Sequence, residues 1–484
     1  MLFNSITFAI FLPIVFLFYW FVFQRNLKVQ NLFVVVVSYV FYGWWDWRFL
    51  ILIILSSFCS WGCGLLIQHA DNRQTSFPKI LSRKFIVVCD IALNLGILGI
   101  FKYFNFFVEN FVSAFASIGV HLQPHTLNII LPVGISFYTF QGLSYSIDIY
   151  KRKIEPTKDI IAFFAFIGFF PLLVAGPIER AKNLLPQFYV KRNFDYEKAV
   201  DGMRQILWGL FKKIVIADNC ATYVNMVFEN PSAQSGSTLL LGAVFFAFQI
   251  YGDFSGYSDI AIGTARLFGI NAMRNFAFPY FSRDIAEFWR RWHISLTTWF
   301  RDYVYIPLGG SRVSKAKVVR NTFIIFLVSG FWHGANWTFI AWGAFHAVLF
   351  LPLILLGKNR KNTDTIAEGK FLPNIKEVFQ MGLTFLLVCI GWVFFRADSI
   401  GQAFEYLGGM ADMSLFSLPL CYKYKKFMAF MIFMLMVEWI QRNKQHGLEI
   451  TSINQWLRRV IYVLIIFSIV WFMGKNEQFI YFQF

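Results

Sequence analysis

Long apolar stretches recur along the whole chain, and polar residues are concentrated between them. Most of these stretches have about 17 to 25 residues, the length that a helix needs to cross the hydrocarbon core of a bilayer. We therefore predict an all-α, polytopic membrane protein with about twelve crossings. The candidate spans lie near residues 6–23, 30–45, 49–68, 85–101, 127–149, 159–178, 203–222, 237–254, 321–355, 376–395, 427–441 and 459–473.

Two of these runs need comment. The run 321–355 is long enough for one tilted helix, two short helices or a broken pair. The first run, 6–23, has no basic residue before it and no small-residue cleavage site after it. We therefore expect it to be a retained span and not a signal peptide.

Basic residues near the two ends of the chain predict its orientation in the membrane. Arg25 and Lys28 follow the first span, and Arg458 and Arg459 precede the last one. Because Lys and Arg concentrate in cytoplasmic loops, both termini are expected on the extracytoplasmic side. The number of crossings is then expected to be even.

The composition agrees with a membrane protein and argues against other classes. Hydrophobic residues make up 57% of the chain and charged residues only 15%, which lies far from the soluble range. The net charge of +17 fits basic loops and anionic lipid better than nucleic acid, which we do not expect as a partner. The six cysteines include no Cys-x-x-Cys pair, so free thiols are expected.

The densest group of polar residues at membrane depth lies between residues 249 and 346. Asp253 and Asp259 stand in the apolar, glycine-containing stretch "QIYGDFSGYSDIAIG". Ionisable groups in lipid are costly, and they usually mark a functional site. We therefore expect both aspartates to line a pocket.

A second segment of this group interleaves arginines with tryptophans. Arg290, Arg291 and Arg301 occur in "EFWRRWHISLTTWFRDYV", where no helical stripe separates charged from aromatic positions. One interpretation is the floor of a pocket that binds an anionic cytoplasmic ligand, such as a phosphate-bearing carrier. The alternative is an interfacial helix with an aromatic belt and snorkelling arginines.

The third segment contains a histidine within an apolar run. His333 stands in "SGFWHGANW" beside Trp332, with Asn336 three residues on, and we expect all three at the pocket. Burial should hold the imidazole neutral and able to accept a proton, although a hydrogen-bonded packing role is the alternative. Neither His333 nor His293 has a second His or Cys at i+3 or i+4, so no metal site is expected.

The segments "FPYFSRDIAEFWRRWHISLTTWFRDYVYIPLGGSR" and "FLVSGFWHGANWTFIAWGAFHA" resemble the signature of the membrane-bound O-acyltransferase superfamily. Within it, the chain is similar to the bacterial branch that serves alginate O-acetylation, peptidoglycan O-acetylation and teichoic-acid D-alanylation. The resemblance implies a bowl of helices around a central tunnel. It also implies that His333 is the general base and that His293 orients or polarises the acyl carbonyl.

The resemblance further implies the donor, the acceptor and a partner. The donor would be a cytoplasmic thioester, acetyl-CoA or an acyl-carrier protein, with no cofactor held permanently. The final acceptor would be an envelope polysaccharide, which could be alginate, another exopolysaccharide or peptidoglycan. A separate periplasmic or extracellular protein with a serine hydrolase-like fold would complete the transfer. The expected location is the bacterial cytoplasmic membrane, and a transporter or flippase for an envelope precursor is the alternative function.

The C-terminal end, "GKNEQFIYFQF", raises a separate hypothesis. We divide the chain into an acyltransferase core, 1–440, and a last helix with an extracytoplasmic tail, 441–484. This last part resembles the small one-helix protein of the teichoic-acid system, whose F-x-Y-x-x-F motif is matched by Phe479, Tyr481 and Phe484. Tyrosine can form covalent intermediates, so Tyr481 is a candidate acyl carrier. The alternative is an aromatic anchor for the last helix.

Overall fold

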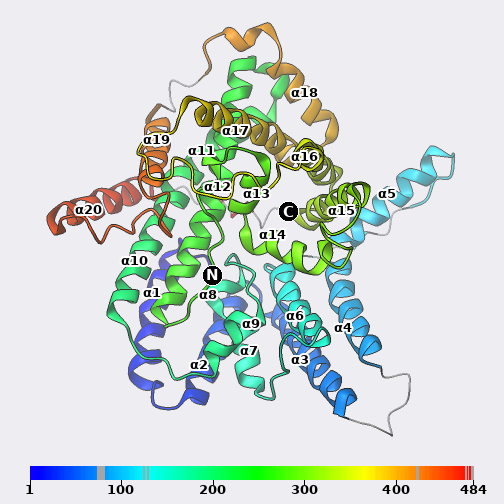
Figure 1. Cartoon of the computed structure of the whole chain (residues 1–484), viewed down its shortest axis with the longest axis vertical. Helices are drawn as coiled ribbons and strands as arrows, with labels where there is room; N and C mark the ends of the chain where they lie inside the picture. Colours follow the sequence, from blue (N-terminus) through cyan, green and yellow to red (C-terminus); the bar gives the residue numbers. More distant parts are fainter. Residues whose placement is uncertain are drawn as a thin grey trace. The chain divides into compact units, whose positions relative to one another are not determined.

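A computed structural model of the chain describes residues 1–72, 82–123, 126–127, 130–420, 425–474, 477 and 479–480. All regular structure in these residues is helical, so the all-α prediction is confirmed (Figure 1). The chain divides into two compact units. The first comprises Met1–Ala199 and Thr264–Met273, and the second comprises Val200–Gly263 and Arg274–Phe484.

The first unit contains mostly apolar helices. A buried polar group, in which Ser60 and Asn94 donate to Asp90 at 3.2 and 3.0 Å, joins α3 to α4. The elements are α1 (Ile6–Leu17), η1 (Phe18–Val22), α2 (Leu27–Gly43), η2 (Trp47–Phe49), α3 (Leu50–Asn72), α4 (Arg83–Leu98), η4 (Gly99–Tyr103), α5 (Phe104–Ser117), α6 (Ile135–Tyr150), α7 (Ile160–Gly168), α8 (Phe170–Leu173), α9 (Ala181–Leu184) and η5 (Leu185–Phe188).

The second unit carries every described residue that the sequence singled out for chemistry. Its elements are α10 (Tyr196–Leu210, which begins in the first unit), η6 (Phe211–Ala217), α11 (Asp218–Glu229), η7 (Pro231–Ala233), α12 (Gly236–Leu267, which ends in the first unit), η8 (Pro279–Phe281), α13 (Ile285–Arg291), α14 (Ile294–Phe300), η9 (Arg301–Tyr305), α15 (Lys315–His333), α16 (Trp337–Leu355), α17 (Ile375–Arg396), α18 (Ile400–Met410), η10 (Met413–Phe416), α19 (Lys425–Ile440) and α20 (Gln455–Phe472).

Six helical segments among the described residues are long and apolar enough to cross a membrane. Two shorter apolar helices, Ile6–Val22 and Leu27–Gly43, accompany them. The total of twelve crossings therefore stays a prediction. The six segments are Trp47–Asp71, Arg83–Ser117, Gly236–Leu267, Trp337–Leu355, Ile375–Arg396 and Gln455–Phe472.

The ambiguous run 321–355 forms two helices, α15 and α16, which lie side by side in Figure 1. Glycines allow this close packing, because a Cβ at Gly330 would collide with the carbonyl oxygen of Phe339. A Cβ at Gly343 would likewise collide with the carbonyl oxygen of Phe326. Small residues at helix crossings let backbones approach in this way. The turn between the two helices begins directly after His333.

Candidate active site

His333 is the last residue of α15 and is only 4% exposed. Its ring lies edge to face against Trp342 and Phe395, with centroids 5.1 and 5.3 Å away. The turn that follows can close only around a glycine, since a Cβ at Gly334 would overlap the ring of Phe339. Asn336 ends the turn and begins α16, accepting a hydrogen bond from the Thr338 amide at 3.0 Å. The sequence FWHGAN thus builds a tight turn that buries the imidazole.

His293 lies at the start of α14 with a left-handed backbone, φ 43° and ψ 55°. Such a conformation is strained for a residue other than glycine, and strain of this kind clusters at functional sites. Asn275 holds the residue in place. Its carbonyl oxygen accepts the Ile294 amide at 2.9 Å, and its side-chain Oδ1 lies 3.1 Å from His293 Nδ1.

The same Oδ1 of Asn275 fixes the tautomer of His293. It accepts the amide and the hydroxyl of Ser295 at 3.2 and 2.9 Å, while Asn275 Nδ2 donates to Ser258 at 3.1 Å. Because Oδ1 can only accept, Nδ1 of His293 carries the proton that faces it. In the neutral ring Nε2 is then the proton-accepting atom.

The structure brings the two histidines together around one tryptophan. The Trp332 ring lies 4.9 Å from the ring of His333 and 6.1 Å from that of His293, measured between centroids. Trp332 is itself buried, and its role at a pocket stays a prediction. On its other side His293 contacts Phe254 of α12 edge to face, at 4.6 Å.

The two acidic residues of α12 face a pair of lysines that sequence reasoning missed. Lys212 Nζ lies 2.6 Å from Asp259, and Lys213 Nζ lies 2.7 Å from Asp253 and 2.6 Å from Asp218. Both lysines belong to η6, a π-helical segment, and such segments are frequent at functional sites. Their sequence signal was two adjacent lysines inside an apolar run.

A small cavity of about 10 Å³, room for one water, lies next to these residues. The cavity is lined by two cationic side chains, Lys212 and Arg274. Asn275, which holds His293 in place, also lines it. Arg274 stacks on the ring of Phe278 at 4.8 Å. Its buried Nη2 atom has no hydrogen-bond partner among the residues that the structure describes. Nothing in the sequence around Arg274 or Asn275 had indicated a role for either residue.

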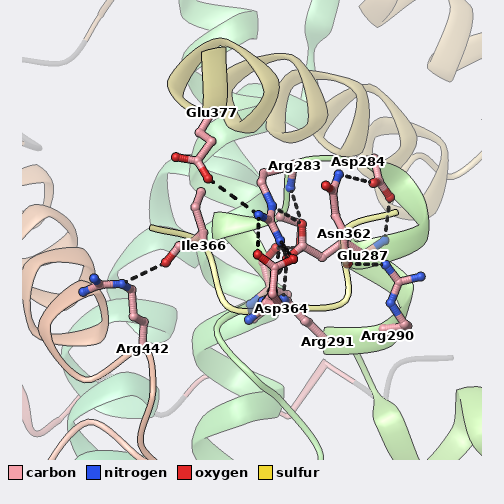
Figure 2. A network of polar contacts seen from close by, with 12 residues as sticks. Arg283, Asp284, Glu287, Arg290, Arg291, Asn362, Asp364, Ile366, Glu377 and Arg442 are labelled. Atoms are coloured by element: carbon pink, nitrogen blue, oxygen red, sulfur yellow. Dashed lines mark hydrogen bonds and ion pairs between the residues drawn. The ribbon is translucent and has the colours of Figure 1, made fainter. Parts of the chain in front are cut away.

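Two of the three predicted donor-binding arginines, Arg290 and Arg291, belong to a network that ties α13 to the loop before α17 (Figure 2). Arg290 donates to the carbonyl oxygens of Asn359 and Asn362 at 2.9 and 2.6 Å. Arg291 pairs with Glu287 at 2.8 Å. Arg301 lies elsewhere, in η9, and its Nε is 2.7 Å from Asp302. Donor binding by these three arginines stays a prediction.

Arg283, which the sequence analysis did not single out, is the centre of this network (Figure 2). It pairs with Glu287 and Asp364 at 3.0 Å each and with Glu377 at 3.6 Å. Hydrogen bonds from Arg283 lower the pKa of the Asp364 carboxyl. This ion-pair network fixes the loop 356–374 against α13.

The C-terminal tail reaches the same interior as the lysine and aspartate pairs. Phe479 and Ile480 are 0% and 1% exposed. The Phe479 ring lies 4.3 Å from that of Tyr257 and 6.1 Å from that of Phe254. Phe254 therefore contacts both the tail and His293. Tyr481 and Phe484 lie outside the described residues.

These features define a class: a multi-pass helical membrane protein with a buried histidine pair in its polar centre. Comparison with known sequences then gives the family. The sequence model of "MBOAT, membrane-bound O-acyltransferase family" matches residues 40–392. The chain belongs to this family and is an O-acyltransferase, which confirms the resemblance inferred from the histidine motifs.

Relatives come from three kinds of envelope enzyme. A probable alginate O-acetylase of Pseudomonas aeruginosa is 40% identical over 86% of this chain and 76% of its own length. A peptidoglycan O-acetyltransferase of Helicobacter pylori is 35% identical over 86% of this chain and 81% of its own. A teichoic acid D-alanyltransferase of Bacillus subtilis is 29% identical over 57% of this chain and 71% of its own. The names of these relatives cover the three activities of the bacterial envelope branch that the sequence motifs resemble.

Proposed function

We propose that this enzyme transfers an acetyl group from a cytoplasmic thioester, through an acyl-Tyr481 intermediate, to an extracytoplasmic acceptor for O-acetylation of an envelope polysaccharide. The observation that supports the relay is the placement of the tail. Ile480, the residue before Tyr481, is buried, and its amide donates to Asp253 at 2.6 Å. The neighbour of Asp253, Phe254, contacts the ring of His293.

The first step replaces the thioester bond of the donor with a phenyl ester bond on Tyr481. His333 accepts the phenolic proton of Tyr481 as the phenolic oxygen attacks the thioester carbonyl. The carbon–sulfur bond then breaks, and the thiolate leaves with the proton held by His333. The products are a phenyl ester on Tyr481 and a free thiol, so no oxidant or further reactant is needed.

The hydrogen bonds around His293 refine its part in this step. Because Nδ1 carries the proton that faces Asn275, a neutral His293 offers only an acceptor at Nε2. It can therefore orient a hydroxyl or a thiol. It can orient or polarise the acyl carbonyl, as the resemblance implies, only when Nε2 also carries a proton.

The order of leaving groups makes the relay energetically reasonable. Thiols ionise near pH 8.5 and phenols near pH 10, and both leave more readily than an alkoxide. An acyl group can therefore pass from sulfur to Tyr481, and from Tyr481 to a sugar hydroxyl, without a strongly unfavourable step. The second transfer would occur on a separate serine hydrolase-like partner outside the cytoplasm.

The choice of acetyl rests on the relatives. Those at 35–40% identity are named O-acetylases or O-acetyltransferases, whereas the D-alanyltransferases are 29–30% identical over a shorter part of the chain. Acetyl-CoA is therefore the proposed donor, with an acyl-carrier thioester as the other candidate. The proposed setting is the bacterial cytoplasmic membrane, with both termini on the extracytoplasmic side.

The test compares native membranes with three full-length variants, given labelled acetyl-CoA. Mass spectrometry of the C-terminal peptide should show an added acetyl group in the native protein. The group should be absent in Tyr481→Phe and His333→Ala. Tyr196→Phe, at an exposed tyrosine, is the matched control and should behave as native. Normal transfer to the acceptor by Tyr481→Phe would refute the relay.

A further inference from the structure

The buried group around Lys213 is completed by the main chain of the C-terminal tail. An ammonium group has three N–H donors, and three oxygens surround this one. Two are the carboxylates of Asp218 and Asp253, at 2.6 and 2.7 Å. The third is the main-chain carbonyl oxygen of Glu477, at 3.1 Å.

The tail also supplies a donor to the same group. The Ile480 amide donates to the second oxygen of Asp253, Oδ2, at 2.6 Å. One acceptor and one donor of the tail, three residues apart, thus meet a lysine and an aspartate of the helical core. Without the tail, Lys213 would keep two of its three oxygens and Oδ2 of Asp253 would lose this donor, both in a buried setting where unpaired polar groups are costly.

Three separate elements build this arrangement. Lys213 comes from the π-helical η6, Asp218 from the first turn of α11 and Asp253 from the middle of α12. Side-chain packing adds a second constraint, because Phe479 lies against Phe254 and Tyr257, which follow Asp253 by one and four positions on α12. The main-chain hydrogen bonds of Glu477 and Ile480 fix the register of the tail along the core. The packing of the Phe479 ring fixes how far the tail enters the core.

We propose that Lys213 and Asp253 form a binding site for the main chain of the tail at Glu477 and Ile480 and hold Tyr481 in register for acylation. The inference rests on the relay proposed above and adds positioning residues to it. Neither side chain is assigned a bond to the acyl group. Their effect on the reaction passes through the tail.

The experiment uses the full-length protein in detergent and measures how fast carboxypeptidase removes the tail. Ile480→Pro deletes the amide donor to Asp253, and Ile480→Val keeps it. Asp253→Leu deletes the acceptor and leaves Lys213 paired one to one with Asp218. We expect Ile480→Pro and Asp253→Leu each to speed trimming at least about tenfold, and Ile480→Val to stay near native.

The double variant tests whether both changes remove the same interaction. Trimming should then be no faster than in the faster single variant, because effects on one shared contact do not add. Native-like trimming of Ile480→Pro, or rates that multiply in the double variant, would overturn the proposal. If Asp253→Leu does not fold, Ile480→Pro against Ile480→Val still decides the question.

A second readout separates this inference from the relay. In Ile480→Pro, the kcat for acetylation of Tyr481 should fall while the KM for acetyl-CoA stays unchanged, because the donor site is intact. If native protein never carries acetyl on Tyr481 but trimming responds as expected, the relay fails and the tail site stands. If native protein is acetylated and Ile480→Pro trims and acetylates like native, the tail site fails and the relay stands.

Discussion

Near the lysine pairs two backbones approach so closely that the loss of stability from an added Cβ can be worked out from the structure. Segment α10–η6 lies against α12 with glycines facing each other. A Cβ at Gly256 would stand 2.8 Å from the carbonyl oxygen of Gly209 and 3.1 Å from the amide nitrogen of Lys213. Both obstacles are main-chain atoms, so no side-chain rotation can relieve them. Gly256→Ala therefore has to push the two segments apart.

The distance that the two segments have to move apart sets the expected loss of stability. Ordinary contact begins at 3.4 Å, so the Gly209 oxygen has to retreat by about 0.6 Å from its 2.8 Å position. Overpacking of this kind costs about 1–3 kcal/mol. At about 2 °C per kcal/mol for a unit of this size, we expect the Tm to fall by roughly 2–6 °C. Gly209→Ala should cost more, since its Cβ would lie 2.5 Å from the Gly256 oxygen.

The assay is thermal unfolding of purified protein in detergent, with Gly382→Ala as the control. Gly382 lies inside α17, and a Cβ there would meet nothing within 4 Å. We expect the Tm values to follow the order Gly382→Ala, Gly256→Ala, Gly209→Ala, from highest to lowest. A Gly256→Ala protein as stable as the Gly382→Ala control would show that the two backbones are not in contact.

Three further outcomes follow from the site. His333→Ala should lower acyl transfer by about 10²–10⁴-fold, the usual contribution of a general base. A variant with native turnover would exclude His333 as the base. Arg283→Met should cost about 3 kcal/mol in unfolding free energy, because it breaks a buried pair with Glu287. Asp364→Asn should cost at most about 1 kcal/mol, because the Asp364 side chain is 47% exposed. Equal losses of stability in thermal unfolding of the two variants would contradict this ranking. Since the pKa of Asp364 is lowered in the folded protein, its ion pair with Arg283 stabilises the loop 356–374 at neutral pH, and this stabilisation is lost as the pH falls below about 4. Limited proteolysis should then cleave the loop faster. A cleavage rate that does not change with acidification would count against this role of Asp364.

The sequence predicted the local patterns of this fold well. Apolar run length identified the membrane-length helices among the described residues. The ambiguity in the run 321–355 came from its apolar character, which continues through the turn. Only the close approach at Gly330 and Gly343 shows that the chain folds back on itself there.

The partners of the charged residues could not be predicted, because they depend on packing between distant segments. Asp253 and Asp259 were recognised as costly charges, but their lysines are forty and forty-seven positions away in the chain. Adjacent residues on a regular α-helix diverge by about 100°, so Lys212 and Lys213 would not both be expected at α12. The π-helical segment η6 brings them there, and no pattern in the sequence indicates it.

The arrangement of α12 explains why the tail and the histidines should be coupled. Asp253 holds the amide of Ile480, and the next residue, Phe254, contacts both Phe479 and the ring of His293. Displacing the tail therefore removes a contact from the aromatic ring that packs on His293. His333 ends α15, and its ring packs against Trp332, Trp342 and Phe395. The main-chain bonds of the tail go instead to Lys213 and Asp253, so substitution of His333 should stop catalysis and leave those bonds in place. Tail binding and proton transfer are thus separable by mutation at His333 but not at Asp253.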